Sequence, residues 1–467
     1  MRRLDFILVK LAGIRLKLIA LLIGFYVICL VALPVSADVP AHKFTDVSVG
    51  ALFIVALRDD GTVWTWGGLG CEKYGEGLAQ RDFWVQSTPV QVPISDVISV
   101  SAGSSFSIAL KEDGTVWMWG LFTNKKGDLT PVQVKNLDNV RQISAKGLHA
   151  LALKNDGTVW SWGDNYGGSL GDGTFENHLD PVQVVGLSNI TSIEGGNFAI
   201  KDDGTVWTWG LTILNENVKI NGSLPSPLAV RDISKPLPYR IPYINNISSI
   251  DIDGGYIHAV YAKDDGTVWT WGVNAFGELG DGTAYEGMNP PYQSMPTQVK
   301  GIQNIKQVVA GTASSLALDN TGKVWAWGGN YAKQLGFDDF FETYSTPKAL
   351  NITNVTKIST GNMNTAFLKN DGSIWIAGGN RCGQKGDGSI SDYIGTPTKV
   401  LGPENEDIDA SDQKPSNNAN SNSSNLNNTH PNNSGMASNT WFSPGVVAFA
   451  LVILIIGCVL YLKVLRK

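Results

Sequence analysis

The sequence predicts an all-β fold, a seven-bladed β-propeller built from four-stranded blades. The segment DGTVWTWG at residues 60–67 reads as a tight turn followed by a strand, and its turn glycine recurs six more times at intervals of 43 to 62 residues. Thirteen of the fifteen tryptophans lie in this one repeated strand. Repeats of this length with four short strands each are typical of propellers, because neighbouring blades cover the faces that a lone blade would expose.

The centre of each repeat is a hairpin. Asp60 and Gly61 predict a type I′ turn, because this pair of residue types tolerates the positive φ angles of such a turn. Trp64 and Trp66 then share one face of the following strand, because side chains alternate along a strand. The preceding run 53–57 is the expected partner strand. The other turn glycines are Gly114, Gly157, Gly204, Gly266, Gly322 and Gly372.

Two further strands complete each repeat. A short strand comes before the hairpin, as at residues 97–100 and 140–144, and a strand that begins with proline closes the repeat. Proline at the first position of the last strand suits the edge of a sheet, where no ladder donor is needed. The closing prolines are Pro89, Pro131, Pro181, Pro296, Pro347 and Pro397.

The repeats resemble those of the regulator of chromosome condensation family. The resemblance rests on the core pattern ALxxDGTVWxWG and on a trailing GxLGDGT, which is complete at residues 168–174 and 277–283. It covers residues 44–402 and implies a seven-bladed propeller, an architecture that hosts unrelated functions. The founding member is a nuclear exchange factor for a small GTPase. An acidic, exported chain does not fit that role, so its interaction residues are not transferred to this sequence.

Composition and charge fit a globular, turn-rich body. The 467 residues are 43% hydrophobic and 17% charged, and they include 52 glycines. The net charge of −6 argues against a nucleic-acid partner, which normally meets a basic surface.

The beginning of the chain predicts export. Residues 1–37 combine several basic residues, an uncharged apolar run at 18–33 and small residues at 35–37, which is the pattern of a signal peptide. An uncleaved signal anchor is the open alternative, because the apolar run is close to the length that spans a bilayer. Either interpretation exports the propeller, which we place at residues 38–402.

The end of the chain predicts an anchor. Residues 403–440 are rich in Asn and Ser and read as a disordered stalk. Residues 441–462 are apolar and long enough for a transmembrane helix, and the short basic tail 463–467 is expected on the cytoplasmic side. A sorting signal that is later removed is the alternative. We therefore predict a single-pass protein of the cell membrane whose propeller lies on the extracytoplasmic side.

Two cysteines in the propeller occupy equivalent repeat positions. Cys71 follows Gly67 by four residues, and Cys382 follows Gly378 by four. The first and seventh repeats become neighbours when the ring closes, so a disulfide that staples the closure is one hypothesis and two unpaired thiols are the other. A bond requires Cα atoms within about 7 Å.

The sequence contains no recognisable catalytic, metal-binding or cofactor-binding motif. Adjacent acids such as Asp59 and Asp60 are explained by their place in the hairpin turn. His149 and His258 share one repeat position, which we interpret as a packing or rim site. We therefore predict no enzymatic activity, no metal and no cofactor. Sequons for N-glycosylation, most plausible in the stalk, predict a glycoprotein; they begin at Asn189, Asn221, Asn246, Asn351, Asn354, Asn422, Asn427 and Asn432.

The segment between the tryptophan strand and the closing strand varies most between repeats, and it is rich in the residue types that anchor protein interfaces. The ring should gather these segments on one rim. The predicted partner-binding residues are Trp84, Phe175, Tyr239, Arg240, Tyr243, Tyr285, Tyr292, Phe340, Phe341 and Tyr344. The favoured function is a non-enzymatic surface module that binds an extracellular or envelope protein. Binding of envelope glycans is the alternative, and hydrolysis or lysis of a polymer would require acids from separate blades to converge on the axis.

Overall fold

A computed structural model describes residues 42–68, 85–120, 129–210, 235–252, 258–284 and 292–401, except for the side chain of Tyr292. The chain divides into two compact units, Met1–Lys414 and Pro415–Lys467, and every described residue belongs to the first. The expected leader 1–37, stalk 403–440, membrane helix 441–462 and tail 463–467 lie outside the described residues. Within the described ranges, no helix has the length and apolar character needed to cross a bilayer.

Seven four-stranded sheets follow one another along the chain. The first contains β1 (Phe44–Val49), β2 (Phe53–Arg58), β3 (Val63–Gly68) and β4 (Val85–Val92). The second contains β5 (Val97–Ala102), β6 (Phe106–Lys111), β7 (Val116–Gly120) and β8 (Val132–Gln133). The third contains β9 (Val140–Lys146), β10 (His149–Lys154), β11 (Val159–Gly163) and β12 (His178–Gln183), with the short 3₁₀ helix η1 (Tyr166–Gly168) before β12.

The remaining four sheets repeat this pattern. The fourth contains β13 (Ile190–Glu194), β14 (Phe198–Lys201), β15 (Thr205–Gly210) and β16 (Lys235–Asn245). The fifth contains β17 (Ile247–Ile252), β18 (His258–Lys263), β19 (Val268–Val273) and β20 (Tyr292–Gln298). The sixth contains β21 (Ile305–Gly311), β22 (Ser314–Asp319), β23 (Val324–Gly329) and β24 (Thr343–Ala349). The seventh contains β25 (Val355–Thr360), β26 (Asn364–Lys369), β27 (Ile374–Gly379) and β28 (Tyr393–Lys399).

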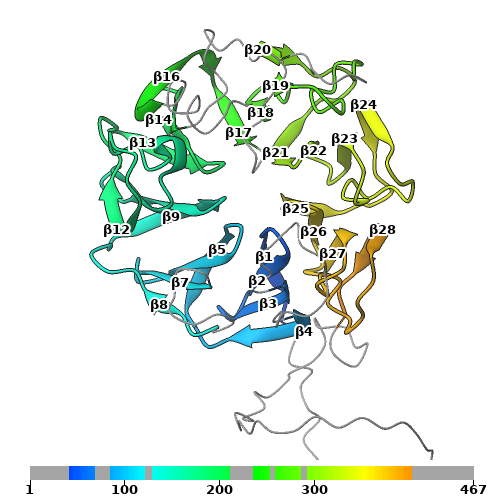
Figure 1. The fold of residues 1–467 in the computed structure, drawn as a ribbon, viewed down its shortest axis with the longest axis horizontal. Helices are drawn as coiled ribbons and strands as arrows, with labels where there is room; N and C mark the ends of the chain where they lie inside the picture. The colour runs from blue at the N-terminus through cyan, green and yellow to red at the C-terminus, as the bar shows by residue number, and fades with distance from the viewer. Residues whose placement is uncertain are drawn as a thin grey trace, which may run out of the picture. The chain divides into compact units, whose positions relative to one another are not determined.

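The prediction of a propeller with seven four-stranded blades is confirmed. The strands of each sheet are antiparallel and in sequence order, so each blade is a meander of one continuous stretch of chain. Figure 1 shows first strands such as β1, β9 and β25 nearest the centre and fourth strands such as β4 and β28 on the outside. β1 of the first blade contacts β25 and β26 of the seventh, so the ring closes without the exchange of a strand.

The turn type predicted for the hairpin is wrong. A type I′ turn requires a positive φ at both central residues. Gly61 has a φ of 77°, but the φ of Asp60 is not positive. The Gly61 N–H donates to the Arg58 carbonyl at 3.1 Å, as in a three-residue loop that ends in a glycine bulge. The Asp60 carboxylate accepts from the N–H and the hydroxyl of Thr62 at 2.9 and 2.6 Å. Aspartate therefore serves this turn through its side chain, which explains the adjacent acids without catalysis.

Five of the fourth strands begin before their prolines rather than at them, whereas β8 begins at Val132, directly after Pro131. β4 starts at Val85 although its proline is Pro89, and β24 starts at Thr343 although its proline is Pro347. The register between β3 and β4 shifts at residue 66 of β3. Thr65 pairs with Val90, whereas Gly67 pairs with Gln86, so residues 87–89 of β4 have no partner in the ladder. Proline lacks an N–H for the ladder and lies within this interruption on the outer edge of the blade.

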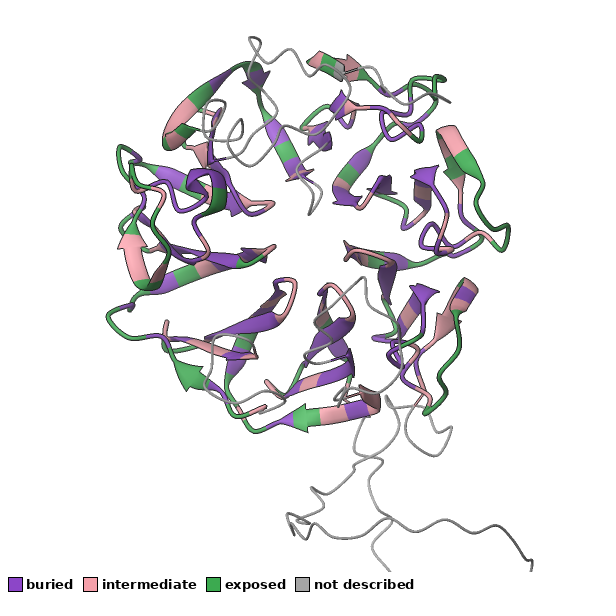
Figure 2. Ribbon diagram, in the orientation of Figure 1, coloured by how far each residue is buried: buried purple, intermediate pink, exposed green. Residues whose placement is uncertain are grey.

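Neighbouring blades share their cores, as the repeat pattern predicts. Trp66 is fully buried and Trp64 half-buried, and both pack with Ile376 of the seventh blade. Val63, on the opposite face of the same strand, packs with Val97 of the second blade. Figure 2 shows buried segments toward the inside of the ring and many exposed segments on the outer strands.

Each blade contributes to two surfaces, which we name the loop face and the turn face. The loop face carries the turns between first and second strands and the loops between third and fourth strands; the Gly68 N–H there donates to the Leu52 carbonyl at 2.8 Å. The turn face carries the Asp-Gly turns and the connections between blades; the Val97 N–H there donates to the Gly61 carbonyl at 3.3 Å. Because every blade is an antiparallel meander, all seven contribute to both faces in the same way.

Candidate functional site

The loops between third and fourth strands are built on a buried asparagine in four of the blades. In the sixth blade, Asn330 Oδ1 accepts from the Leu335 N–H at 3.1 Å, and its Nδ2 donates to the carbonyls of Phe337 and Asp339 at 3.1 and 2.7 Å. Equivalent asparagines accept from the same loop position in the third, fifth and seventh blades: Asn165, Asn274 and Asn380. These hydrogen bonds hold the loop backbone in one conformation, and the loop residues next to the bonded carbonyls therefore have fixed backbone positions.

One position after this hydrogen-bonded segment carries an apolar residue in all four blades. The asparagine amide donates to the carbonyl just before it, at Thr174, Thr283, Asp339 or Ser389. The residues that follow are Phe175, Ala284, Phe340 and Ile390. Phe175 is half-buried, whereas Phe340 is 41% and Ile390 60% exposed. The structure thus brings the predicted Phe175 and Phe340 to one repeat position and adds Ile390, which counting from the Gly-Asp-Gly trailer would have found.

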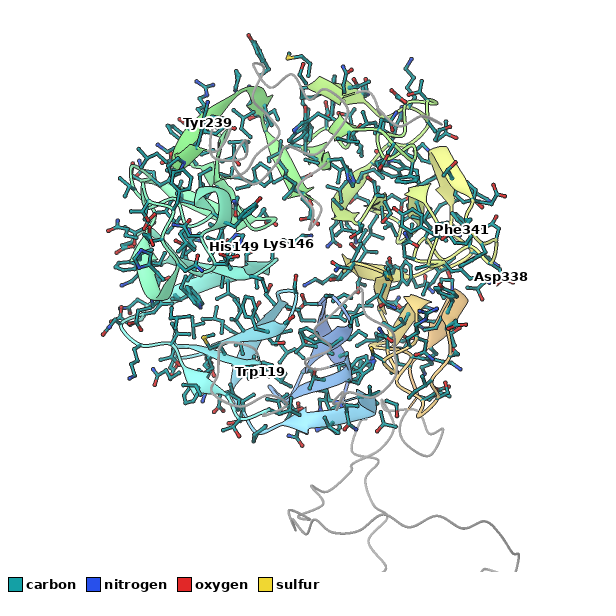
Figure 3. All side chains as sticks on the ribbon, viewed as in Figure 1. Trp119, Lys146, His149, Tyr239, Asp338 and Phe341 are labelled. Atoms are coloured by element: carbon teal, nitrogen blue, oxygen red, sulfur yellow. The ribbon has the colours of Figure 1, made fainter. Side chains whose placement is uncertain are left out.

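The sixth blade presents an aromatic pair at this position. The centroid of the Phe340 ring lies 4.1 Å from that of Phe341 and 5.0 Å from that of Tyr393 in β28 of the next blade. Phe341 is 69% exposed and has a φ of 62°, a left-handed conformation that bulky residues rarely adopt. Figure 3 shows Phe341 and Asp338 on the outer part of the ring, whereas Lys146 lies near its centre.

Ion pairs flank the aromatic pair on both blades. On the sixth blade, Asp338 lies 2.7 Å from Lys333, and its side chain is 76% exposed. On the seventh, Arg381 lies 3.1 Å from Asp392, whose side chain is 72% exposed. Pairs with this much exposure contribute little to stability, so their main effect is on the charge of the surface.

The base of the loop is held by Tyr344. Its hydroxyl donates to Asp339, and its ring lies 4.8 Å from the Phe337 ring. Burial raises the pKa of Tyr344, and the nearby Asp339 and Glu342 raise it further. The Lys348 ammonium lies over both rings, at 4.5 Å from Tyr344 and 4.4 Å from Phe337. A cation of β24 therefore already rests on two aromatic faces at the base of the loop.

Three predicted partner residues lie in a strand rather than in a loop. Tyr239, Arg240 and Tyr243 belong to β16, whose prolines are compatible with an edge strand although the sequence reading treated them as part of a loop insertion. Tyr243 is 76% exposed with a φ of 68°, and the Lys235 ammonium lies 4.0 Å from the Tyr239 ring. Figure 3 shows Tyr239 at the outer edge of the ring, away from Phe341.

The other predicted partner residues divide into two groups. Tyr344 and Tyr292 lie in the fourth strands β24 and β20 rather than in loops. Trp84, Tyr285 and the side chain of Tyr292 lie outside the described residues. The structure therefore places Phe340 and Phe341 on the loop that leads directly into Tyr344 of β24, and separates all three from the residues of β16.

The axis of the ring holds a polar network that the sequence analysis missed. Lys146 of β9 donates to both Asp251 oxygens of β17, at 3.2 and 3.1 Å, and to the Ala310 carbonyl of β21 at 3.2 Å. Serines on the first strands accept backbone N–H groups of the adjoining blade, as Ser48 does from Ala102 at 3.0 Å. The first strands therefore bond one blade to the next around the axis.

Acids from separate blades do approach the axis, but not as an open catalytic cleft. The pKa of Glu194 is raised to about 7, chiefly by burial and also by the nearby Asp251, although Ser192 and Lys357 act to lower it. Asp251 is occupied by Lys146 and by the Ala310 N–H at 2.9 Å. The cavity at the loop-face end of the axis measures about 30 Å³, room for one or two water molecules rather than a sugar ring. Nothing in the described residues indicates enzymatic activity.

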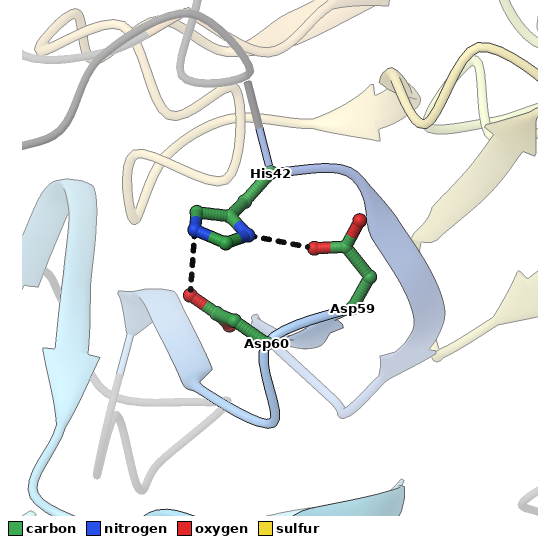
Figure 4. Close-up of side chains that lie close together, drawn as sticks. All are labelled: His42, Asp59 and Asp60. Atoms are coloured by element: carbon green, nitrogen blue, oxygen red, sulfur yellow. Dashed lines mark hydrogen bonds and ion pairs between the residues drawn. The ribbon is translucent and has the colours of Figure 1, made fainter. Parts of the chain in front are cut away.

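His42, Asp59 and Asp60 gather on the turn face. His42 Nδ1 lies 3.0 Å from Asp59 Oδ1, and His42 Nε2 lies 3.8 Å from Asp60 Oδ2. Figure 4 shows the two ring nitrogens directed at different carboxylates. The His42–Asp59 contact has the length of an ordinary hydrogen bond, which accounts for the arrangement, so we assign no metal to it.

The two histidines of the repeated second strand are packing residues. His149 and His258 are both buried, and each bridges to the following blade. His149 Nε2 lies 3.0 Å from the Gly196 carbonyl, and His258 Nε2 lies 3.0 Å from Ser315 Oγ. Burial lowers the pKa of both imidazoles, that of His258 to about 3. Both rings are therefore neutral at physiological pH.

The proposed disulfide and glycans remain predictions. Cys382 is buried, and its N–H donates to Gln384 Oε1 at 3.0 Å, but Cys71 lies outside the described residues. The sequon asparagines Asn189, Asn246 and Asn354 have φ of 57°, 52° and 62° in connections between blades. Asparagine tolerates this conformation better than most residues, so turn geometry explains these positions without a glycan.

Comparison with known families identifies the repeat. The Regulator of chromosome condensation (RCC1) repeat matches residues 60–110, 156–199, 265–318 and 321–368. A second description of the same repeat matches residues 44–75, 97–127, 140–168 and 305–334, and the two together cover more than half of the chain. The chain belongs to the regulator of chromosome condensation repeat family. The resemblance noted from the sequence is confirmed, and RCC1 repeats account for the blades described above.

Similar RCC1-repeat proteins have diverse names. The chain is 25% identical to Ultraviolet-B receptor UVR8 of Arabidopsis thaliana over 314 residues, 64% of this chain and 68% of UVR8. It is 27% identical to Protein pim1 of Schizosaccharomyces pombe over 337 residues, 65% and 62% of the two chains. It is 35% identical to Probable E3 ubiquitin-protein ligase HERC3 of Homo sapiens over 114 residues, which are 24% of this chain but 10% of HERC3. The chain thus matches only about a tenth of HERC3.

Two solved structures have the same fold. Prp20p from Saccharomyces cerevisiae superposes with a TM-score of 0.56 at 23% identity, over 68% of this chain and 80% of that one. Human WBSCR16 superposes with a TM-score of 0.58 at 20% identity, over 73% and 94%. At these identities the likeness confirms the propeller and carries no function with it.

Proposed function

We propose that this RCC1-repeat chain is a cell-surface, membrane-tethered propeller that binds an extracellular or envelope protein and catalyses no reaction. The sequence of the leader 1–37 and of the apolar stretch 441–462 supports the tether. Relatives support protein binding: the Prp20p structure is described together with binding to Gsp1p and histones, and a second structure contains Kap60 bound to yeast RCC1.

The observation that carries the proposal is the aromatic pair Phe340 and Phe341. Aromatic side chains supply much of the binding energy in protein interfaces when they enter a partner's pocket. Phe341 exposes 69% of its surface from a loop that Asn330 holds in shape. A ring fixed in position before binding loses little conformational entropy when a partner covers it.

Two measurements on cells test this proposal. Surface biotinylation of intact cells that express the full chain should label the propeller, and failure to label it would contradict the tether. Crosslinking and capture of surface proteins should then depend on the aromatic pair, so the double variant F340S/F341S should lose the captured protein. Ile98→Ser, at a 54% exposed apolar position in β5, is the matched control. Capture that the double variant leaves unchanged would contradict this binding surface, and binding to neutral glycans on an array would favour the carbohydrate alternative.

A further inference from the structure

The geometry points to the kind of partner that the sixth-blade loop takes: a basic protein segment, with an arginine or lysine side chain laid against Phe341. This inference rests on the proposed protein-binding function and adds the chemistry of the bound segment. We name the surface formed by residues 338–342 and Tyr393 the aromatic-acidic surface.

The backbone of this surface is held in a costly conformation. Phe341 has a φ of 62°, where a non-glycine residue loses about 1 kcal/mol or more. The loop is closed by the Asn330 N–H, which donates to the Glu342 carbonyl at 2.9 Å, and by the Asn330 side chain. In this conformation Phe341 leaves 69% of its surface exposed. A strained backbone that displays an apolar ring to solvent is typical of a binding site rather than of packing.

The charge around the two rings selects a basic partner. Four exposed acids belong to this surface or adjoin it in the chain: Asp338, Asp339 and Glu342 beside the two rings, and Asp392 beside Tyr393. Lys333 and Arg381 pair with two of these, which leaves Asp339 and Glu342 without a basic partner among the described residues. Acids so placed attract a cationic segment and repel anionic lipid headgroups and anionic glycans.

Rings on this surface and beside it already hold cations. The Lys348 ammonium lies 4.4 Å from the Phe337 centroid, and the Arg381 guanidinium lies 5.9 Å from that of Tyr393. Among the described residues, no cation lies over Phe340 or Phe341. A guanidinium or ammonium of a partner could occupy the open face of Phe341 while a second cation pairs with Glu342.

Binding of a defined peptide tests the inference. The probe is a fluorescent peptide of alternating arginine and glycine, and its isosteric citrulline analogue serves as the neutral reference. Anisotropy is measured on the purified full-length protein in an uncharged detergent. We expect the arginine peptide to bind, and the citrulline peptide to bind about tenfold more weakly or not at all. The double variant F340S/F341S should bind the arginine peptide about tenfold more weakly than the wild type does.

Matched single-charge variants locate the binding. Glu342→Gln should weaken the binding of the arginine peptide several-fold, and this difference in affinity should shrink as the salt concentration rises. Asp138→Asn removes one exposed acid from the turn face and should change nothing. Equal binding of the citrulline peptide, or equal effects of the two acid variants, would overturn the inference. If surface-protein capture depends on Phe340 and Phe341 but the arginine peptide does not bind, the basic partner is wrong and protein binding stands; if neither depends on them, both proposals fall.

Discussion

The indole N–H of Trp66 in the first blade donates to the backbone carbonyl of Gln384 in the seventh blade at 2.8 Å. The same bond joins other neighbours, because Trp209 donates to the Ser169 carbonyl at 2.9 Å. A fully buried indole in these blades therefore ties its blade to the loop of the blade before it. Between Trp66 and Gln384 this bond joins the two ends of the propeller, which no shared strand connects.

Replacing Trp66 with Phe removes the donor and part of a fully buried ring. We expect the free energy of unfolding to fall by about 2 to 4 kcal/mol, from the lost hydrogen bond and the cavity left behind. Urea denaturation of the full-length protein, followed by circular dichroism, measures the change. Trp64→Phe is the matched control in the same strand and should cost clearly less, because Trp64 is only half-buried. Equal decreases in the free energy of unfolding for the two variants would show that the bond from Trp66 to Gln384 adds nothing to stability.

Much of the fold follows from the sequence because the repeats are regular. Trp64, Trp66 and Val63 alternate as β3 requires, and the structure packs them against two different blades. The turn type was misjudged because Asp-Gly is compatible with two hairpin geometries, and these differ in the sign of φ at Asp60, which the sequence does not show. Five of the fourth strands were predicted too short because a proline inside an edge strand looks like its beginning.

The binding surface was less predictable for a different reason. Phe340 and Phe341 were found because the loop is rich in aromatic residues, but alternation alone cannot tell whether a residue such as Tyr243 lies in a loop or on an edge strand. The polar residues of the axis were missed for a related reason. The pattern of β9 shows that Lys146 faces away from the core, but not that it faces an enclosed axis where it meets Asp251.

Glu194 should make the stability of the ring depend on pH. Burial raises the pKa of its carboxyl to about 7, whereas an unfolded glutamate titrates near 4.3. The folded state therefore holds the proton of Glu194 more tightly than the unfolded state does. The stability that this group contributes is fully present below about pH 4.3 and is lost as pH rises toward 7. Glu194→Gln should match the wild type at pH 4.5 and exceed it by about 3 kcal/mol at pH 8.

Chemical denaturation at both pH values measures this difference. Glu112→Gln, at an exposed position of the second blade, is the control and should be silent at both. A difference between Glu194→Gln and the wild type that is the same at pH 4.5 and pH 8 would contradict a buried, titrating carboxyl.

The ion pair between Lys146 and Asp251 should be strongly coupled. Their side chains are 17% and 13% exposed, and Asp251 also accepts the Ala310 N–H. Lys146→Met leaves a largely buried carboxylate without its cation, and we expect a loss of about 3 kcal/mol. The double variant K146M/D251N should recover part of that loss. A double-mutant cycle of unfolding free energies measures the coupling, and strictly additive losses would mean that the pair does not hold the axis together.

Glu278 occupies a position where two sibling blades have glutamine. Gln334 Oε1 accepts from the Ala332 N–H at 2.8 Å, and its Nε2 donates to the Gly329 carbonyl at 3.0 Å. In the fifth blade, Glu278 Oε2 accepts from the Phe276 N–H at 2.7 Å. Glutamine supplies both an acceptor and a donor at this position, whereas an ionised carboxylate supplies acceptors only. Because Gln334 uses its donor, we expect the fifth blade to accommodate Glu278 better with the proton on its carboxyl than as a carboxylate.

Exchanging the two side chain types tests this expectation. An unfolded glutamate releases its proton near pH 4.3, so keeping Glu278 protonated costs more stability as pH rises above that value. Glu278→Gln should therefore raise the melting temperature at pH 8 and leave it nearly unchanged at pH 4.5. Gln334→Glu places a glutamate at the equivalent position of the sixth blade, so it should lower the melting temperature, and most at pH 8. Differential scanning calorimetry of both variants decides the matter, because a Gln334→Glu loss that does not grow with pH would show that this position accepts a charged carboxylate.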